Sequence, residues 1–213
     1  MSWIDVDYDV DTFLWMPTSF EEEAGFSGPE EWGRLFAEAL WDLQEEGPEL
    51  DEQVDSLAAS LTNFAEQIPA AFPGQAVYLH VPDPRQMPMP VYVDSWPAEG
   101  DRTERLREIV RADDTEAVEK PMVDEFETEH LGRGLRSLRY FTEPQEGALC
   151  CSVNYAWRVP EHGIDVRVWS VSGDLGRVAM ALDDIDALTR SIRVRADDDL
   201  PDEPDDEDDA PGA

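Results

Sequence analysis

Four stretches, MVDEFETEH (122–130), LRSLRYF (135–141), ALCCSVNYAWRV (148–159) and IDVRVWSVS (164–172), decide the fold of this chain. Each is rich in β-branched and aromatic residues, which are the types that strands favour. The residues between them include Gly132, Gly134, Pro144, Gly147 and Pro160, which are typical of short hairpin turns. The pattern therefore predicts an antiparallel meander of four strands.

Further strands and helices are predicted on both sides of this meander. Apolar and acidic residues alternate over 4–11, and apolar runs at 76–81 and 90–96 complete the predicted strands. Apolar residues at helical spacing predict four helices. The first begins near the capping residue Ser27, and the second and third span about 50–67 and 102–111. The fourth begins at Ser172 or Asp174. This order predicts an α+β fold with a mainly antiparallel sheet covered by helices.

The charge of the chain is strongly negative and unevenly distributed. The 213 residues include 50 acidic and 16 basic ones, which gives a net charge of −34. Residues 196–213 contain ten acids, no base and one large apolar side chain, so we expect a disordered acidic tail after a single domain spanning 1–195. Residues 1–84 contain 19 acids and one base, Arg34, whereas 15 bases follow between 85 and 195.

This charge favours some classes of partner and disfavours others. Nucleic acids and anionic membranes bind clustered cationic charge, so we expect neither as a partner. An acidic surface instead favours a basic protein partner, because complementary charge accelerates association. The first residues, MSWIDVDYDV, lack the basic and apolar regions of a signal peptide, and no apolar run reaches the length of a membrane span. We therefore expect a cytoplasmic protein, with its oligomeric state left open.

The residues that could carry catalysis or bind a metal do not form a recognisable motif. Ser27 in GFSGP departs from a nucleophile elbow, Cys150 and Cys151 are adjacent, and the three histidines lack metal-binding spacing. Asp5, Asp7 and Asp9 lack the Gly and Glu of a calcium loop. Two other acidic groups, Glu125/Glu127/Glu129 and Asp183/Asp184/Asp186, are explained by ion pairs on a strand and on a helix. We expect no catalytic, cofactor or metal site.

The candidate partner contacts are large apolar residues. Trp41 lies nearly opposite the apolar stripe of its predicted helix, so it is either covered by a neighbouring element or exposed to a partner. Trp169 shares a strand face with charged residues and has the same two interpretations. Met87 and Met89, in a proline-rich loop, provide either an adaptable contact or a seal for the edge of the core.

The C-terminal part of the chain resembles members of the PsbP-like group from GC-rich bacteria. The resemblance covers about residues 120–195 and lies in FETEHLGRGLRSLRYF, a strand ending in NYAWRV, IDVRVWS and a helix containing LDDIDALTRSIRV. The resemblance lies in the order of the predicted elements and in the general composition of these segments. It implies an α/β/α sandwich around an antiparallel sheet and a non-enzymatic role in binding or assembly.

These observations lead to three functional hypotheses. The first is a non-catalytic interaction protein, such as an assembly factor, inhibitor or immunity-like protein, whose acidic face binds a basic protein. The second is a small carboxylate-based enzyme or ligand-binding domain, which predicts a deep pocket with convergent polar groups. The third is an ordinary protein whose acidic surface is an adaptation to high salt.

Overall fold

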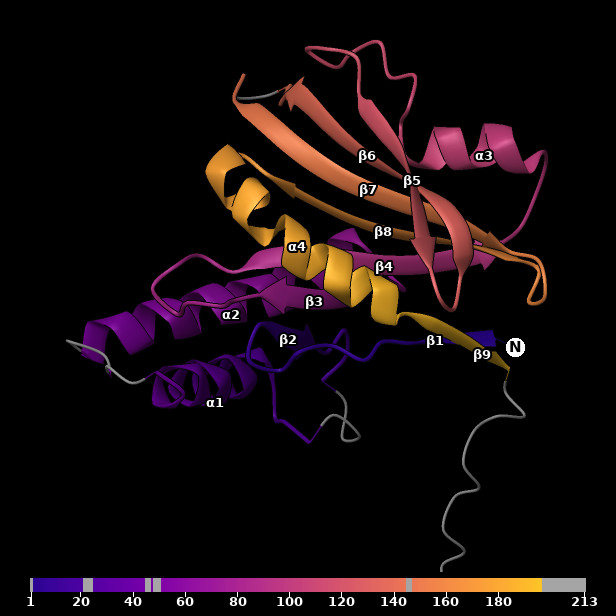
Figure 1. The fold of residues 1–213 in the computed structure, drawn as a ribbon. Coiled ribbons are helices and arrows are strands. Elements are labelled where there is room, and N and C mark those ends of the chain that lie inside the picture. Colours follow the sequence, from indigo (N-terminus) through magenta and orange to yellow (C-terminus); the bar gives the residue numbers. More distant parts are fainter. Residues whose placement is uncertain (1, 21–24, 45–46, 48–50, 145–146, 197–213) are drawn as a thin grey trace, which may run out of the picture.

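The computed structural model describes residues 2–20, 25–44, 47, 51–144 and 147–196, and it has the predicted α+β fold (Figure 1). Seven strands form one antiparallel sheet in the order β2-β3-β4-β8-β7-β6-β5, and two terminal strands, β1 and β9, form a second sheet. The strands are β1 (Ser2–Asp5), β2 (Phe13–Met16), β3 (Ala76–His80), β4 (Met89–Pro97), β5 (Met122–Thr128), β6 (Gly132–Thr142), β7 (Leu149–Val159), β8 (Ile164–Ser172) and β9 (Arg193–Ala196). The helices are α1 (Pro29–Asp42), α2 (Asp51–Ala71), α3 (Arg102–Ile109) and α4 (Leu175–Ser191).

The predicted meander is confirmed as strands β5 to β8, which pair in chain order. Its register places Ser137 opposite Asn154 and Asn154 opposite Trp169. Strand β4 then pairs with β8, so that Trp169 lies opposite Tyr92. Because residues that face each other across a ladder point to the same side, these four side chains form one row on one face of the sheet.

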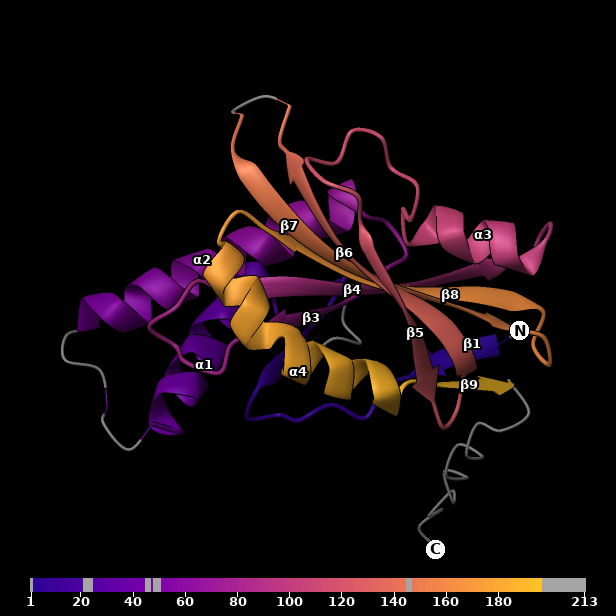
Figure 2. The same ribbon diagram turned by 45° about the horizontal axis from the view of Figure 1, so that its top comes forward.

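Helices cover both faces of the sheet, as the predicted α/β/α layering requires. Helix α4 crosses one face and packs Val178, Ile185 and Leu188 against β4, β7 and β8 (Figure 1). The other face is covered in two places. Helices α1 and α2 bury Trp32, Trp41 and Leu61 over β2 to β4, whereas α3 buries Leu106 and Ile109 over β6 and β7. In Figure 2 the α1–α2 hairpin and α3 are well separated, at opposite ends of the sheet.

The prediction of one strand over residues 4–11 is wrong. Strand β1 ends at Asp5, and β2 begins at Phe13. Between them Asp9 forms a turn, because its carboxylate accepts hydrogen bonds from the Asp11 amide and the Thr12 hydroxyl. Ile4, Val6 and Tyr8 still pack on the core, so the alternating pattern correctly predicted the buried side but not a continuous ladder.

The chain termini differ from prediction in another respect. The sequence predicted the acidic tail directly after the last helix, but β9 follows α4 and pairs with β1, with Ile4 opposite Val194. Arg195 donates two hydrogen bonds to the Asp5 carboxylate, at 2.7 and 3.0 Å. The rest of the predicted tail, residues 197–213, lies outside the described residues.

Helix boundaries follow the capping signals with one difference. Asp174 caps α4 as predicted, accepting a hydrogen bond from the Arg177 amide. In α1 the N-cap is Gly28, and the predicted capping residue Ser27 instead donates from its amide and hydroxyl to the Glu31 carboxylate. Among the described residues, no helix combines the length and apolarity needed to cross a membrane.

Candidate binding site

One strip of the sheet, between the C-terminal end of α2 and helix α3, is hollowed into a cavity. The cavity has a volume of about 420 Å³ and lies on the face that α1, α2 and α3 share. It is lined by aromatic, polar and basic side chains: Phe72, Gln75, Arg111, Glu116, Arg139, Phe141, Thr142, Pro144, Ser152, Asn154, Arg167, Trp169 and Val171. We refer to it as the sheet cavity.

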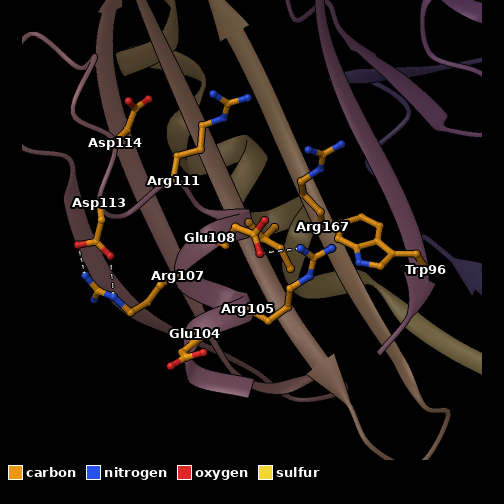
Figure 3. A pocket seen from close by; sticks show the side chains of 10 residues that line it. Trp96, Glu104, Arg105, Arg107, Glu108, Arg111, Asp113, Asp114 and Arg167 are labelled. Atoms are coloured by element: carbon orange, nitrogen blue, oxygen red, sulfur yellow. Dashed lines mark hydrogen bonds and ion pairs between the residues drawn. The ribbon is translucent and has the colours of Figure 1, made fainter. Parts of the chain in front are cut away.

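A second, more open hollow of about 710 Å³ continues from the sheet cavity along α3. The two share Arg111 and Arg167, which Figure 3 shows among the side chains that line the hollow along α3. Arg105 and Arg107, also in this hollow, form ion pairs with Glu108 and Asp113. Together the two hollows are lined by five arginines and five carboxylates, so this region is close to neutral although the chain as a whole is strongly acidic.

Aromatic side chains form one wall of the sheet cavity. Trp169 stacks on Tyr92, with ring centroids 4.2 Å apart and planes 14° from parallel. Phe72, just beyond α2, meets the Trp169 ring edge-on at 5.4 Å. Tyr92 and Asn154 flank Trp169 on the two neighbouring strands, and both Trp169 and Asn154 line the cavity.

A hydrogen-bonded polar group forms the floor. The Asn154 amide nitrogen donates to Ser137 Oγ at 3.3 Å and to Ser152 Oγ at 3.2 Å. Ser137 donates in turn to the Val110 carbonyl at 2.5 Å. These three side chains are buried, so the network fixes their orientation. No hydrogen bond to Asn154 Oδ1 is found among the described residues, which leaves an acceptor in the cavity wall.

Carboxylates hold two of the three cavity arginines in place. Arg167 donates from Nε and Nη2 to both oxygens of Asp94, at 3.1 and 2.6 Å, and lies between the rings of Trp96 and Trp169. Arg139 is only 6% exposed, forms an ion pair with Asp114, and lies 4.1 Å from the centroid of Phe141. Although burial acts to raise it, the pKa of Asp114 is below its usual value because the Glu116 amide, Arg139 and, more weakly, Arg111 stabilise its charge.

The third arginine, Arg111, differs from the other two. It follows α3 with a φ of 54° and is the only non-glycine residue with positive φ in the described part of the chain. This conformation costs an arginine on the order of 1 kcal/mol, and here it ends α3, because the Arg111 amide donates to the Glu108 carbonyl and the Ala112 amide to the Arg107 carbonyl. Its side chain is exposed, and no ion pair or hydrogen bond of its guanidinium is found among the described residues.

The arrangement supports binding and orientation of a ligand. Guanidinium groups stay protonated, so these arginines can stabilise negative charge but cannot exchange protons as acids or bases. His80 contacts Asp184 at 2.8 Å and Asp186 lies on α4, both away from the cavity, whereas the free thiol Cys150 lies opposite Phe141, at the edge of the sheet cavity. Within the described residues, no group of three or more His, Cys, Asp or Glu side chains could hold a metal ion.

The structure places the four predicted partner contacts in different environments. Trp41 is 2% exposed and lies in the α1–α2 core beneath Arg85, and Met89 is buried at the start of β4. Met87 is 62% exposed, and Trp169 is half-buried in the wall of the sheet cavity. Sequence reasoning missed Arg111, Arg139, Arg167 and Asn154, because they come from separate segments that only the sheet register brings together.

The comparisons with known proteins do not identify a family. No family model matches the chain, and no match is found among curated proteins. One solved structure with a similar backbone is that of LpqN, described as involved in cell envelope biogenesis of Mycobacterium tuberculosis. The identity is 8%, the TM-score is 0.46, and the match covers 92% of this chain and 85% of that one. Similarity at this level assigns neither a family nor a function, and membership of the PsbP-like group stays a prediction.

Proposed function

We propose that this is a non-catalytic interaction protein that binds a basic protein partner through the α1–α2 hairpin. The observation that supports this best is the position of an exposed methionine, Met87, beside a helix surface rich in carboxylates. Such a surface combines electrostatic attraction with an apolar anchor. An assembly factor, an inhibitor or an immunity protein acting in the cytoplasm would have these properties.

The acidic part of this surface lies on α1 and α2, whose eight carboxylates, four in each helix, are all exposed. The only base in the two helices, Arg34, forms ion pairs with Glu38 and Asp55 and is itself exposed. One guanidinium cannot offset the charge of both helices, so the hairpin presents a negative potential to solvent. The carboxylates are Glu30, Glu31, Glu38, Asp42, Asp51, Glu52, Asp55 and Glu66.

The apolar part of the surface is centred on Met87. This residue lines a cavity of about 390 Å³ together with Trp41 and Glu52. On its other side it lines a wider groove of about 710 Å³ with Phe64 and Met180, the latter being 69% exposed. Methionine side chains adapt to the shape of a partner, so Met87 is suited to anchor an apolar residue while nearby carboxylates attract its basic neighbours.

The experiment compares three forms of the full chain in affinity capture from the native host, followed by binding of the purified partner. One form is the wild type, the second carries Asp42→Asn, Glu52→Gln and Glu66→Gln, and the third is a matched control with Glu125→Gln, Glu129→Gln and Glu161→Gln. All six positions are exposed, so both variants lose the same charge. We expect a basic partner whose dissociation constant rises about tenfold in the α1–α2 variant.

Two further measurements make the test specific. Binding should weaken as salt is raised, because the attraction is screened, and Met87→Ala should weaken binding at every salt concentration. An equal loss in the control variant, an acidic partner, or affinity that is independent of salt would refute the proposal.

A further inference from the structure

We propose that the sheet cavity binds a small aromatic monocarboxylate, with its ring against Trp169 and its carboxylate on Arg111. This inference goes beyond the proposed protein interaction, because the cavity lies toward α3 and, of the residues lining the two hollows beside Met87, shares only Val171. It rests on three features of the cavity: its charge, its aromatic wall and its size.

The charge of the cavity favours a ligand with one negative charge. Arg139 and Arg167 are each paired with a carboxylate, Asp114 and Asp94. Arg111 forms no side-chain ion pair or hydrogen bond among the described residues, although its charge acts on Asp114, and it lines both hollows. A guanidinium presents a planar fork of donors that matches a carboxylate. Glu116 on the same wall disfavours ligands with several negative charges, such as polyphosphates.

The wall and floor favour a flat ring. Tyr92 covers one face of the Trp169 indole, the Arg167 guanidinium lies 5.4 Å from the ring centroid, and the part of the indole left uncovered lines the cavity. Offset or edge-on contact with an accessible part of an indole ring stabilises aromatic ligands. At the floor, Asn154 Oδ1 provides an acceptor for a ring substituent. The combination of apolar walls with a few fixed polar groups is typical of small-molecule sites.

The size of the cavity sets a limit on the ligand. A volume of about 420 Å³ lies in the range of small-molecule sites and is sufficient for one or two fused rings with a carboxylate. Arg167, held by Asp94 at the junction of the two hollows, marks the side from which such a molecule would enter. These limits define the probe: 2-naphthoate, with its neutral analogue 2-naphthamide as the matched control.

The first measurement uses the wild-type chain. Titration calorimetry gives the affinity for each probe, and the indole N–H signals in a ¹⁵N correlation spectrum locate the site, with Trp169→Phe assigning the Trp169 signal. We expect 2-naphthoate to bind at least about tenfold more tightly than 2-naphthamide, since the free energy of a hydrogen bond between charged groups corresponds to a difference in affinity of about this size. We also expect the Trp169 signal to shift most. Absence of 2-naphthoate binding at millimolar concentration, or equal affinity for the two probes, would overturn the proposal.

The second measurement uses two arginine variants. Arg111→Asn removes the charge and keeps a residue that tolerates positive φ, whereas Arg133→Gln removes an exposed arginine on the β5–β6 hairpin. We expect Arg111→Asn to weaken 2-naphthoate binding about tenfold and to leave 2-naphthamide unchanged, with no effect of Arg133→Gln. If Arg111→Asn does not change the preference for the carboxylate, the assignment of Arg111 is wrong. The wild-type comparison decides the site even if this variant fails to fold.

A last control separates this proposal from the proposed protein partner. The variant that carries Asp42→Asn, Glu52→Gln and Glu66→Gln should bind 2-naphthoate as the wild type does, because none of these residues lines the sheet cavity. Loss of 2-naphthoate binding in this variant would contradict the assignment to the sheet cavity, whether or not the protein partner is found.

Discussion

Tyr155 Oη donates a hydrogen bond of 2.6 Å to Asp186 Oδ1, and this bond joins the centre of the sheet to helix α4. The other carboxylate oxygen of Asp186 accepts from Arg136 at 2.9 Å, and Arg190 lies 3.6 Å away. Asp186 is therefore a buried carboxylate with partners on β6, β7 and its own helix. From the sequence, Asp186 was explained only by an ion pair on its own helix.

We expect this contact to stabilise the fold. Tyr155→Phe removes one hydrogen bond to a buried charge and should lower the free energy of unfolding by about 1.5–3 kcal/mol. Asp186→Ala leaves Arg136 and Tyr155 without their partner, and it should cost about 3–5 kcal/mol. Denaturant unfolding of both single variants and the double variant measures the coupling. If the two losses are additive, the residues do not act as a pair.

Buried tyrosines predict a loss of stability at alkaline pH. Burial raises the pKa of Tyr92 to about 12, and it also raises the pKa values of Tyr78 and Tyr155. These phenols ionise more readily in the unfolded chain, near pH 10, so the stability that they contribute is present below pH 10 and is lost as pH rises toward the folded values. Absorbance titration of tyrosinate, together with unfolding curves, checks this. If three or more tyrosines of the folded protein ionise near pH 10, the prediction that burial raises these pKa values is contradicted.

A separate pH effect is expected at His80. Burial lowers its pKa below 6.5, although the contact with Asp184 acts in the opposite direction, and the Arg177 charge adds to the lowering. The folded state therefore disfavours the protonated ring, and the stability it contributes above pH 6.5 is lost as pH falls through the folded pKa. The imidazole signals in an NMR titration should show a midpoint below 6.5 for His80. A midpoint above this value would show that Asp184 dominates.

The close approach of α1 and α2 depends on Gly33. A Cβ at this position would lie 2.5 Å from Thr62 Oγ1 and 2.9 Å from the Ala58 carbonyl oxygen. Gly33→Ala should lower the free energy of unfolding by about 1–3 kcal/mol, because the two helices must move apart. Gly176→Ala, inside helix α4, is the matched control, since the nearest atom to a Cβ there is Asp174 Oδ1 at 3.5 Å, an ordinary van der Waals contact. Thermal unfolding of both variants tests this prediction, which would be contradicted if the two variants unfolded at the same temperature.

The fold was largely predictable from the sequence, because most of it is built from local signals. The meander has short turns, and α4 has both an apolar stripe and the cap Asp174. Strand β9 could not be predicted in this way, since its partner β1 lies at the other end of the chain and the ladder depends on that distant pairing. The alternation at 4–11 was misleading because side chains of an irregular segment can also alternate between core and solvent.

The candidate site was less predictable than the fold. In a strand sequence an arginine such as Arg167 is typical of a cross-strand ion pair, and it does pair with Asp94. Its second role appears only when Arg111 and Arg139 are brought to the same strip of the sheet. Of the predicted contacts, Trp169 lies in this cavity, but sequence spacing cannot show which face of an indole remains open.

The pairing of β1 with β9 determines how the domain responds to force. Ser2 lies opposite Ala196 and Asp5 opposite Arg193, so residues 2 and 196 lie at the same end of this two-stranded ladder. Tension applied between residues 2 and 196 would act on one end of the ladder. The inter-strand hydrogen bonds would then break one pair after another rather than all at once. The domain is therefore expected to be mechanically weak along this direction, whatever its thermal stability.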